Sequence, residues 1–169
     1  VLKRDFSDQS AHVVCMRIDR LNSAWNAHSD HAWMVQPKLV EFSRNFEFRM
    51  YVIGGRCRWG LATRFRDDDV IEKIAVSAGR AIWNVDGREA AQIAERVTEC
   101  VARNLQTHAR HFLRVDMVRR NDGGWWINEL EFFGNAFLHF EVFDNHCELL
   151  KELDLEVRKW MSATCGQPK

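Results

Sequence analysis

The chain has few of the features that would narrow its class at once. Its net formal charge at pH 7 is zero, so no overall charge favours binding to nucleic acid or to an anionic membrane. No apolar run is long enough to span a membrane, and no secretory signal sequence is recognisable. The chain also has only two prolines, no internal repeat and no low-complexity linker. These absences favour a cytoplasmic globular protein without nucleic-acid or membrane partners.

The five cysteines are odd in number and scattered, and they form no Cys-x-x-Cys pair. This pattern disfavours a disulfide framework or a zinc knuckle and is typical of reduced cysteines in the cytosol. With 169 residues, of which 46% are hydrophobic and 28% are charged, the chain is long enough to build a sizeable core. Seven tryptophans and eleven phenylalanines predict either a heavily aromatic core or a broad apolar cleft.

The expected elements mix strands and helices. Alternating or β-rich segments predict strands over residues 1–6, 12–18, 32–36, 46–53 and 57–65, followed by a hairpin at 114–131, and we expect 32–36 to be buried. Two helices are expected, over 86–105 and 144–161, and their inward apolar side chains are Ile93, Val97, Val101 and Leu105 in the first and Leu149, Leu150, Leu153, Val157 and Trp160 in the second. Hairpins interleaved with helices favour an α+β fold of antiparallel sheets packed with helices.

The strongest functional signal is the segment Leu113–Gly134, LRVDMVRRNDGGWWINELEFFG. Its Asn-Asp-Gly-Gly sequence predicts a hairpin turn. Strand side chains alternate between faces, so Arg114 and Asp116 share a face, and Asp116 falls roughly opposite Glu129. Glu131 then lies on the same face as Glu129, and three gathered carboxylates repel one another unless a cation lies among them. Oxygen ligands suit Mg²⁺ and an arginine suits phosphate, which predicts a site for a metal-bound nucleotide polyphosphate.

The plain alternative for this segment is a solvated sheet face with ordinary salt bridges, in which Arg114 pairs with Asp116 or Glu129. Aromatic and aliphatic side chains surround the carboxylates, which is unusual for a merely solvated edge; they are Trp125, Trp126, Ile127, Phe132 and Phe133. The functional interpretation is therefore favoured.

The same segment resembles the ATP-grasp superfamily, whose members carry an Arg-x-Asp strand, a strand with Glu-x-Asn or Glu-x-Glu, and then a glycine. The matching residues here are Arg114-Val115-Asp116, Asn128-Glu129-Leu130-Glu131 and Gly134. The resemblance implies that Asp116, Glu129 and Glu131 hold Mg²⁺ against the β- and γ-phosphates of ATP. It also implies that Arg114 is the catalytic residue that meets phosphate or an acyl-phosphate intermediate.

The resemblance runs in the family's order from Lys3 to Gly134. Lys3 is similar to the phosphate-binding lysine, although the loop that follows it, residues 7–10, contains no glycine. Residues 34–39 resemble the segment that reads adenine, and Glu47 resembles the glutamate that binds ribose hydroxyls. The nucleotide-binding residues implied in this way are Lys3, Gln36, Lys38, Leu39, Glu47 and Arg64. Glu41 competes with Glu47 for the ribose, and the bland alternative for Glu47 is a pair with Arg49 or Arg64.

The implied fold is an ATP-grasp domain that binds nucleotide between two subdomains. Residues 1–37 would form the small subdomain with the phosphate loop, and 38–169 would form the large subdomain with the metal-binding hairpin. We expect that a further N-terminal region is missing from this chain. The implied activity is that of an ATP- and Mg²⁺-dependent ligase, which activates a small-molecule carboxylate as an acyl phosphate for attack by an amine or another nucleophile.

Two alternatives stay open. One is an ATP-binding assembly or interaction factor with little turnover and a protein partner, similar to the family members that help assemble a translation initiation factor. The other is a structural domain whose acidic hairpin binds nothing. The histidines add no metal site: His28 and His31 are expected in a surface loop, and His108 and His111 near the C-terminus of the long helix favour its dipole.

Overall fold

The computed structural model describes residues 2–4, 13–14, 17, 19, 33–65, 71–77, 85–105, 107–132 and 146–165. The chain divides into two compact units, unit 1 at 1–40 and unit 2 at 41–169, and each is described by itself. The sequence analysis placed a division after residue 37, and the roles it assigned to the two parts stay predictions. Among the residues described, no helix is long and apolar enough to cross a membrane.

Unit 1 contains a small antiparallel sheet with the strand order β2-β1-β3. Its strands are β1 (Leu2–Arg4), β2 (Val13–Val14) and β3 (Trp33–Val35). Each lies within a segment expected to be a strand. The expectation that the third strand is buried is wrong at its end, since Val35 is 50% exposed. The physical reason is that β3 is an outer strand of a sheet only three strands wide, so little of the sheet encloses it.

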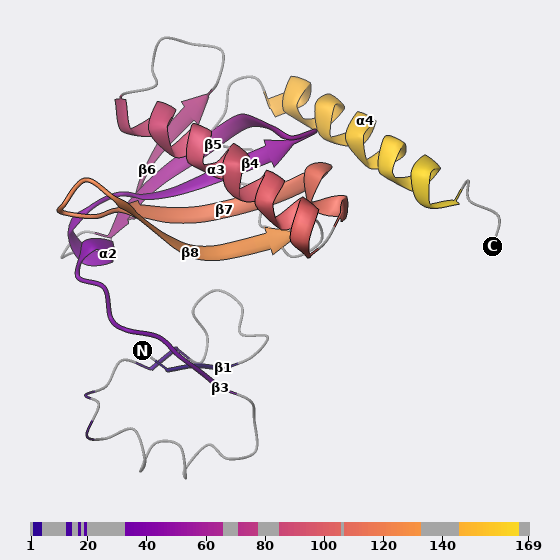
Figure 1. Cartoon of the computed structure of the whole chain (residues 1–169). Helices are drawn as coiled ribbons and strands as arrows, with labels where there is room; N and C mark the ends of the chain where they lie inside the picture. The colour runs from indigo at the N-terminus through magenta and orange to yellow at the C-terminus, as the bar shows by residue number, and fades with distance from the viewer. Residues whose placement is uncertain are drawn as a thin grey trace. The chain divides into compact units, whose positions relative to one another are not determined.

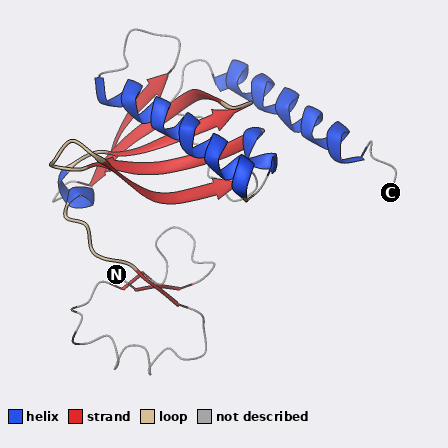
Figure 2. Cartoon of the chain, viewed as in Figure 1, coloured by secondary structure: helices blue, strands red, loops and turns tan. Residues whose placement is uncertain are grey.

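Unit 2 is built on a five-stranded antiparallel sheet with the order β6-β5-β4-β7-β8 (Figures 1 and 2). The strands are β4 (Glu47–Ile53), β5 (Arg56–Phe65), β6 (Ile71–Ser77), β7 (Phe112–Arg119) and β8 (Trp125–Phe132). The helices are α2 (Glu41–Arg44), α3 (Val85–Asn104), the short 3-10 helix η2 (Thr107–Arg110) and α4 (His146–Cys165). The α+β class expected from the sequence is confirmed.

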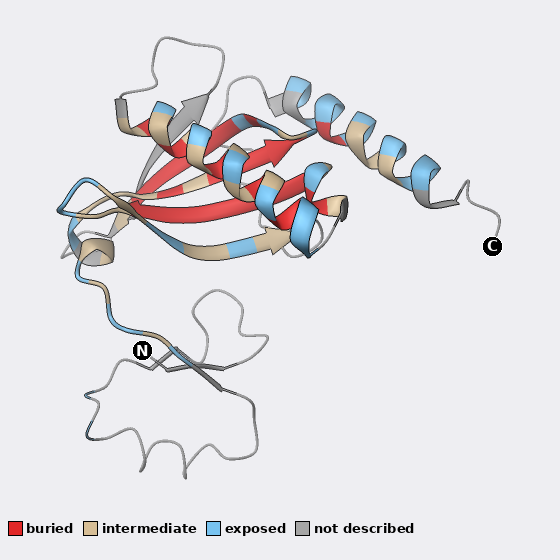
Figure 3. Cartoon of the chain, in the orientation of Figure 1, coloured by how far each residue is buried: buried red, intermediate tan, exposed pale blue. Residues whose placement is uncertain are grey.

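Helix α3 crosses one face of this sheet, and its side toward the sheet is buried (Figure 3). The side chains that it buries are mostly small: Ala90, Ala94, Thr98, Val101 and Ala102. Small residues let the helix lie close to the strands, while Ile93 and Val97 pack partly buried at its flank. The expected place of Leu105 in the buried stripe is wrong, because α3 ends at Asn104 and the Leu105 side chain is 74% exposed.

Helix α4 packs through a narrow stripe that contains Leu153, Val157 and Trp160. Leu153 is buried, and the other two are half-buried. The expectation that Leu150 points inward is wrong, since its side chain is 44% exposed. Leu150 lies three residues before the buried Leu153, so its side chain points about 60° away from that of Leu153 around the helix axis. The side chain of Leu149, also expected inward, lies outside the described part of the chain.

The turn between β4 and β5 consists of Gly54 and Gly55, as expected. Both have left-handed backbone conformations, with φ of 59° and 74°, which suits the tight turn of a two-residue hairpin. Their N–H groups donate to the carbonyl oxygens of His111 and Arg110, at 3.3 and 2.8 Å. A Cβ on Gly54 would lie 3.1 Å from the Glu156 carboxyl carbon, whereas one on Gly55 would meet nothing within 4 Å.

We expect Gly54→Ala to destabilise the protein more than Gly55→Ala. Both variants force alanine into the left-handed region, which costs about 1–2 kcal/mol. Only Gly54→Ala also displaces Glu156 of α4, which we expect to cost a further ~1 kcal/mol. Urea denaturation of the two variants beside the wild type measures this difference. Equal stability of the two variants would show that α4 does not press on this turn.

Candidate functional site

The hairpin of β7 and β8 has the register that the sequence predicts. Asp116 lies opposite Glu129, and Arg114 lies opposite Glu131. The pairing shifts after Asp116, since Met117 lies opposite Ile127, so Asn128 is the extra residue of a β-bulge. Bulges redirect side chains. Here the Asn128 amide donates a hydrogen bond from Nδ2 to the Glu47 carboxylate at 3.2 Å.

Alternation along β4 and β7 separates the core from the candidate site. Phe48, Met50 and Val115 belong to the apolar cluster beneath α3. Arg49 and Asp116, which pair across β4 and β7, therefore lie on the opposite face of the sheet. Polar side chains gather on that face from three neighbouring strands.

Arg114 is the centre of this group. Its Nε donates to Asp116 Oδ1 and its Nη2 to Asp116 Oδ2, each at 2.8 Å, in a two-pronged ion pair. The same Nη2 lies 2.9 Å from Glu131 Oε1. Arg114 and Asp116 are only 4% and 1% exposed. The Arg114 guanidinium therefore supplies a positive charge that offsets the carboxylates of Asp116 and Glu131.

Burial governs the protonation of this pair. Burial raises the pKa of Asp116 to about 7, against the opposing effects of the Arg114 hydrogen bond and charge, and the charge of Glu47 raises it further. Burial alone would lower the pKa of Arg114. The hydrogen bond to Asp116 and the charges of Asp116 and Glu131 outweigh it and raise the pKa above its usual value. Arg114 thus keeps its charge, while Asp116 is poised near neutral pH.

A second ion pair on the same face joins Glu47 to the cluster. Arg49 Nη2 donates to Glu47 Oε2 at 3.2 Å, and Arg49 Nε lies 3.9 Å from Asp116 Oδ2. Sequence reasoning did not assign Arg49 or Asn128 to the site. The signal for Arg49 was available, since it lies two residues after Glu47 on one strand face. The bulge that redirects Asn128 has no comparable signal in the sequence.

The acidic residues offer oxygen ligands suited to Mg²⁺, but they do not form a complete cage. In the part of the chain that the structure covers, no three His, Cys, Asp or Glu side chains are grouped so as to hold a metal ion. Magnesium commonly takes only one or two carboxylates and completes its shell with substrate phosphates and water. Asp116 and Glu129, paired across the hairpin, fit such a set, with Glu131 one alternation further along β8.

Two further residues that the sequence analysis weighed for nucleotide binding, Arg64 and Glu41, lie in unit 2. The Arg64 guanidinium, at the end of β5, sits 4.6 Å from the centre of the Phe46 ring. Glu41 is half-buried in α2. Four predicted nucleotide-binding residues belong to unit 1, so they are described apart from the cluster: Lys3 in β1, whose side chain lies outside the described residues, and Gln36, Lys38 and Leu39 after β3. The loop at 7–10 and Gly134 also lie outside the described residues.

No family model matches the chain, and no curated protein matches it by sequence. Its structure, however, is similar to those of ATP-grasp ligases. The ATP-grasp ligase PsnB, complexed with minimal precursor, Mg and ADP, matches 92% of this chain and 45% of its own, with a TM-score of 0.55 and 19% identity. The D-alanine–D-alanine ligase of Bacillus anthracis, complexed with ATP, matches 94% of this chain and 60% of its own, with a TM-score of 0.54 and 14% identity.

These likenesses confirm the predicted resemblance at the level of the fold. This chain spans about half the length of the ligases that it matches. Its fold is therefore that of part of an ATP-grasp ligase.

Proposed function

We propose that the chain binds ATP with Mg²⁺ and transfers the γ-phosphoryl group to a carboxylate, which gives an acyl phosphate and ADP. An amine or another nucleophile would then attack the acyl carbon and displace phosphate. The observation that carries this proposal is the cluster of buried Arg114 and Asp116 with half-buried Glu131 on β7 and β8, in which Glu129 lies opposite Asp116. Similar folds belong to ligases whose structures contain Mg with ADP, or ATP. The fold alone leaves the reaction open, and the cluster's chemistry supports this one.

Asp116 and Glu129 would hold the metal, and the resemblance implies Glu131 as a third ligand. Magnesium, when bound, supplies positive charge to the phosphates of the nucleotide. Asp116 and Glu129 offer it adjacent carboxylates, and Glu131 offers a third. Because Arg114 already binds Asp116 and Glu131, metal binding requires these carboxylates to share their oxygens with the arginine. Arg114 and the metal, both positively charged, would then keep the carboxylates ionised and in place.

Arg114 would bind the anionic group that forms on the substrate. Its contacts with Asp116 and Glu131 use Nε and Nη2, so Nη1 can donate to a phosphate or carboxylate oxygen. Holding the guanidinium by two carboxylates fixes its direction before substrate arrives, which reduces the entropy lost on binding. Its charge would counter the negative charge of the acyl phosphate.

The remaining residues that the resemblance implies would bind the nucleotide. Glu47 is suited to the ribose hydroxyls because Arg49 and Asn128 hold its two oxygens in a defined direction. Arg64 and Lys3 would meet phosphate. Gln36, Lys38 and Leu39 would line the adenine. The small-molecule carboxylate and the amine complete the set of partners.

The decisive experiment is a calorimetric titration of ATP, with and without Mg²⁺, into the wild type and into Asp116→Asn combined with Glu129→Gln. We expect magnesium-dependent binding to the wild type and at least a tenfold loss of affinity in the double variant, since about 1.4 kcal/mol is enough for that change. Both replacements are isosteric, so they remove charge with little change of packing.

The matched control is Asp122→Asn, at the exposed turn of the same hairpin, where the asparagine can still accept the hydrogen bond from Gly124. It should bind Mg-ATP like the wild type. Absence of magnesium-dependent binding in a folded wild type would refute the proposal and leave a structural domain.

A second candidate is an ATP-binding assembly factor of the same fold with little turnover. The glycine-free loop at 7–10 favours it, because glycine normally lets backbone N–H groups approach the phosphates. This candidate predicts the same Mg-ATP binding without release of ADP across a panel of carboxylates and amines, and it predicts a protein partner.

A further inference from the structure

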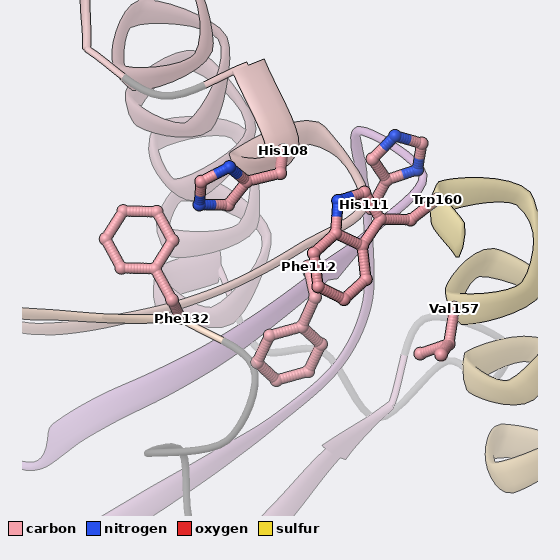
Figure 4. Close-up of a pocket in the computed structure, with 6 residues that line it drawn as sticks. All are labelled: His108, His111, Phe112, Phe132, Val157 and Trp160. Atoms are coloured by element: carbon pink, nitrogen blue, oxygen red, sulfur yellow. The ribbon is translucent and has the colours of Figure 1, made fainter. Parts of the chain in front are cut away.

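A cavity of about 100 Å³ lies where α4 meets the η2 segment and the ends of β7 and β8 (Figure 4). Figure 4 shows Val157 and Trp160 projecting from α4 toward the strands. We call this cavity the α4 pocket, and its lining residues are His108, His111, Phe112, Phe132, Val157 and Trp160. The sequence analysis assigned the two histidines only to the helix dipole.

The lining of the α4 pocket selects for an apolar occupant. Aromatic rings dominate it: His108 contacts the rings of Phe132 and Trp160, with centroids 5.5 and 6.2 Å apart. Among the described residues, no carboxylate, lysine or arginine lines it. Nearby, the Glu156 carboxylate lies 3.5 Å from His111 Nδ1. Burial raises the pKa of Glu156, but its contacts with Lys159 and His111 outweigh burial and lower the pKa below the usual value. A ring in the pocket would stack on these aromatic walls.

The size of the α4 pocket limits the occupant to one compact group. An engineered apolar cavity of about 150 Å³ in another protein holds benzene. The α4 pocket is somewhat smaller and is partly open, so it can take most of one ring or a branched aliphatic group while the rest of the molecule extends outward.

The position of the α4 pocket connects it to Arg114. Phe112 of its wall and Arg114 are two residues apart on β7, so their side chains share a face and their Cα atoms are about 6.6 Å apart. Tyr51 lies opposite Arg114 in the sheet, and its ring lies 6.5 Å from the Phe112 ring, centre to centre. A molecule with its ring in the pocket and a short chain therefore has the length to place a carboxylate near Arg114.

We infer that the α4 pocket receives the apolar group of the carboxylate substrate, which places a compact aromatic or branched aliphatic acid among the substrates of this protein. The inference rests on the proposed function, in which Arg114 meets the reacting carboxylate. It adds what that function leaves open, namely which carboxylates are accepted.

The test is a titration of 3-phenylpropionate and of propionate into the chain, followed by calorimetry or by ligand-observed NMR. Burial of the ring should make 3-phenylpropionate bind at least about tenfold more tightly than propionate. Val157→Phe fills the pocket and should abolish this preference. Leu155→Phe enlarges a neighbouring exposed side chain of α4 by a comparable step and should keep it.

Arg114→Lys tests the link to the reacting group. It should weaken binding of 3-phenylpropionate several-fold and leave binding of 3-phenylpropan-1-ol, which has no charge, unchanged. Each variant is also titrated with Mg-ATP. Equal affinity for 3-phenylpropionate and propionate, or a preference that survives Val157→Phe, with Mg-ATP binding intact, would overturn the pocket assignment alone. A ring preference without any Mg-ATP binding would overturn the proposed function and with it the assignment to a substrate.

Discussion

Replacement of Arg114 by methionine is expected to lower the free energy of unfolding by about 3–5 kcal/mol, the range found when one member of a buried ion pair is removed. The arginine is 4% exposed and holds both Asp116 and Glu131, so its loss removes the counter-charge that the two carboxylates share and leaves the more distant Arg49, 3.9 Å from Asp116. Below its pKa of about 7, Asp116 can take up a proton, and we therefore expect a smaller loss at pH 6 than at pH 8. Urea denaturation at the two pH values measures both effects.

The matched control for this prediction is Arg120→Met. Arg120 pairs with Asp122 in the exposed turn of the same hairpin, where an ion pair contributes about 0–1 kcal/mol. If Arg114→Met proved no more destabilising than this control, the buried cluster would not be a unit of stability. Added Mg²⁺ offers a second readout, since a metal that binds the freed carboxylates should recover part of the lost stability.

Trp59→Ala is expected to cost about 3–5 kcal/mol, as is usual when a large buried aromatic side chain is truncated. Trp59 is completely buried in β5, and its ring stacks on Tyr51 with centroids 4.8 Å apart and planes inclined by 14°. Tyr51 lies opposite Arg114, so the cavity left by the tryptophan would also loosen the floor of the candidate site. Thermal and urea unfolding measure the loss, and Mg-ATP titration measures its effect on the site.

The matched control is Trp126→Ala, which truncates a tryptophan of β8. The Trp126 side chain is 38% exposed, and the Arg120 guanidinium lies over its ring. We expect a loss of ~1 kcal/mol or less, because little buried area and one exposed cation–π contact disappear. Comparable losses in the two tryptophan variants would contradict the burial on which the prediction depends.

The hairpin at 112–132 shows how far local patterns reach. The side chains of a strand alternate with a period of two, and a turn sets the register, so the sequence predicts Asp116 opposite Glu129, and the structure confirms this pairing. The bulge at Asn128 could not be predicted, because it depends on how the strand twists against its neighbour. The sequence offered two counter-charges for the carboxylates, a metal ion or Arg114. The structure shows Arg114 paired with Asp116 and Glu131, and the metal stays a prediction.

Helix α3 shows where such patterns mislead. The spacing of large apolar residues predicted a stripe that ends at Leu105, but the helix buries a neighbouring row of alanines, and Leu105 is exposed. The spacing of apolar residues shows roughly which side of a helix faces the core, but it does not decide between neighbouring rows of side chains. Close packing of the helix on the sheet then favours the row with small side chains. In α4 the expected inward face is likewise only partly right, since Leu153 is buried and Leu150, three residues earlier, is exposed.

The sequence by itself determined the α+β class, the antiparallel hairpin with its register, and the resemblance to ATP-grasp enzymes, because alternation, turns and short motifs are local properties. Only the tertiary structure decided that Asn128 joins Glu47, that Asp116 is buried enough to titrate near neutral pH, and that α4 closes a cavity beside Phe112. Burial, charge pairing and cavities depend on which segments meet across the fold, and a linear pattern of residues does not contain that information.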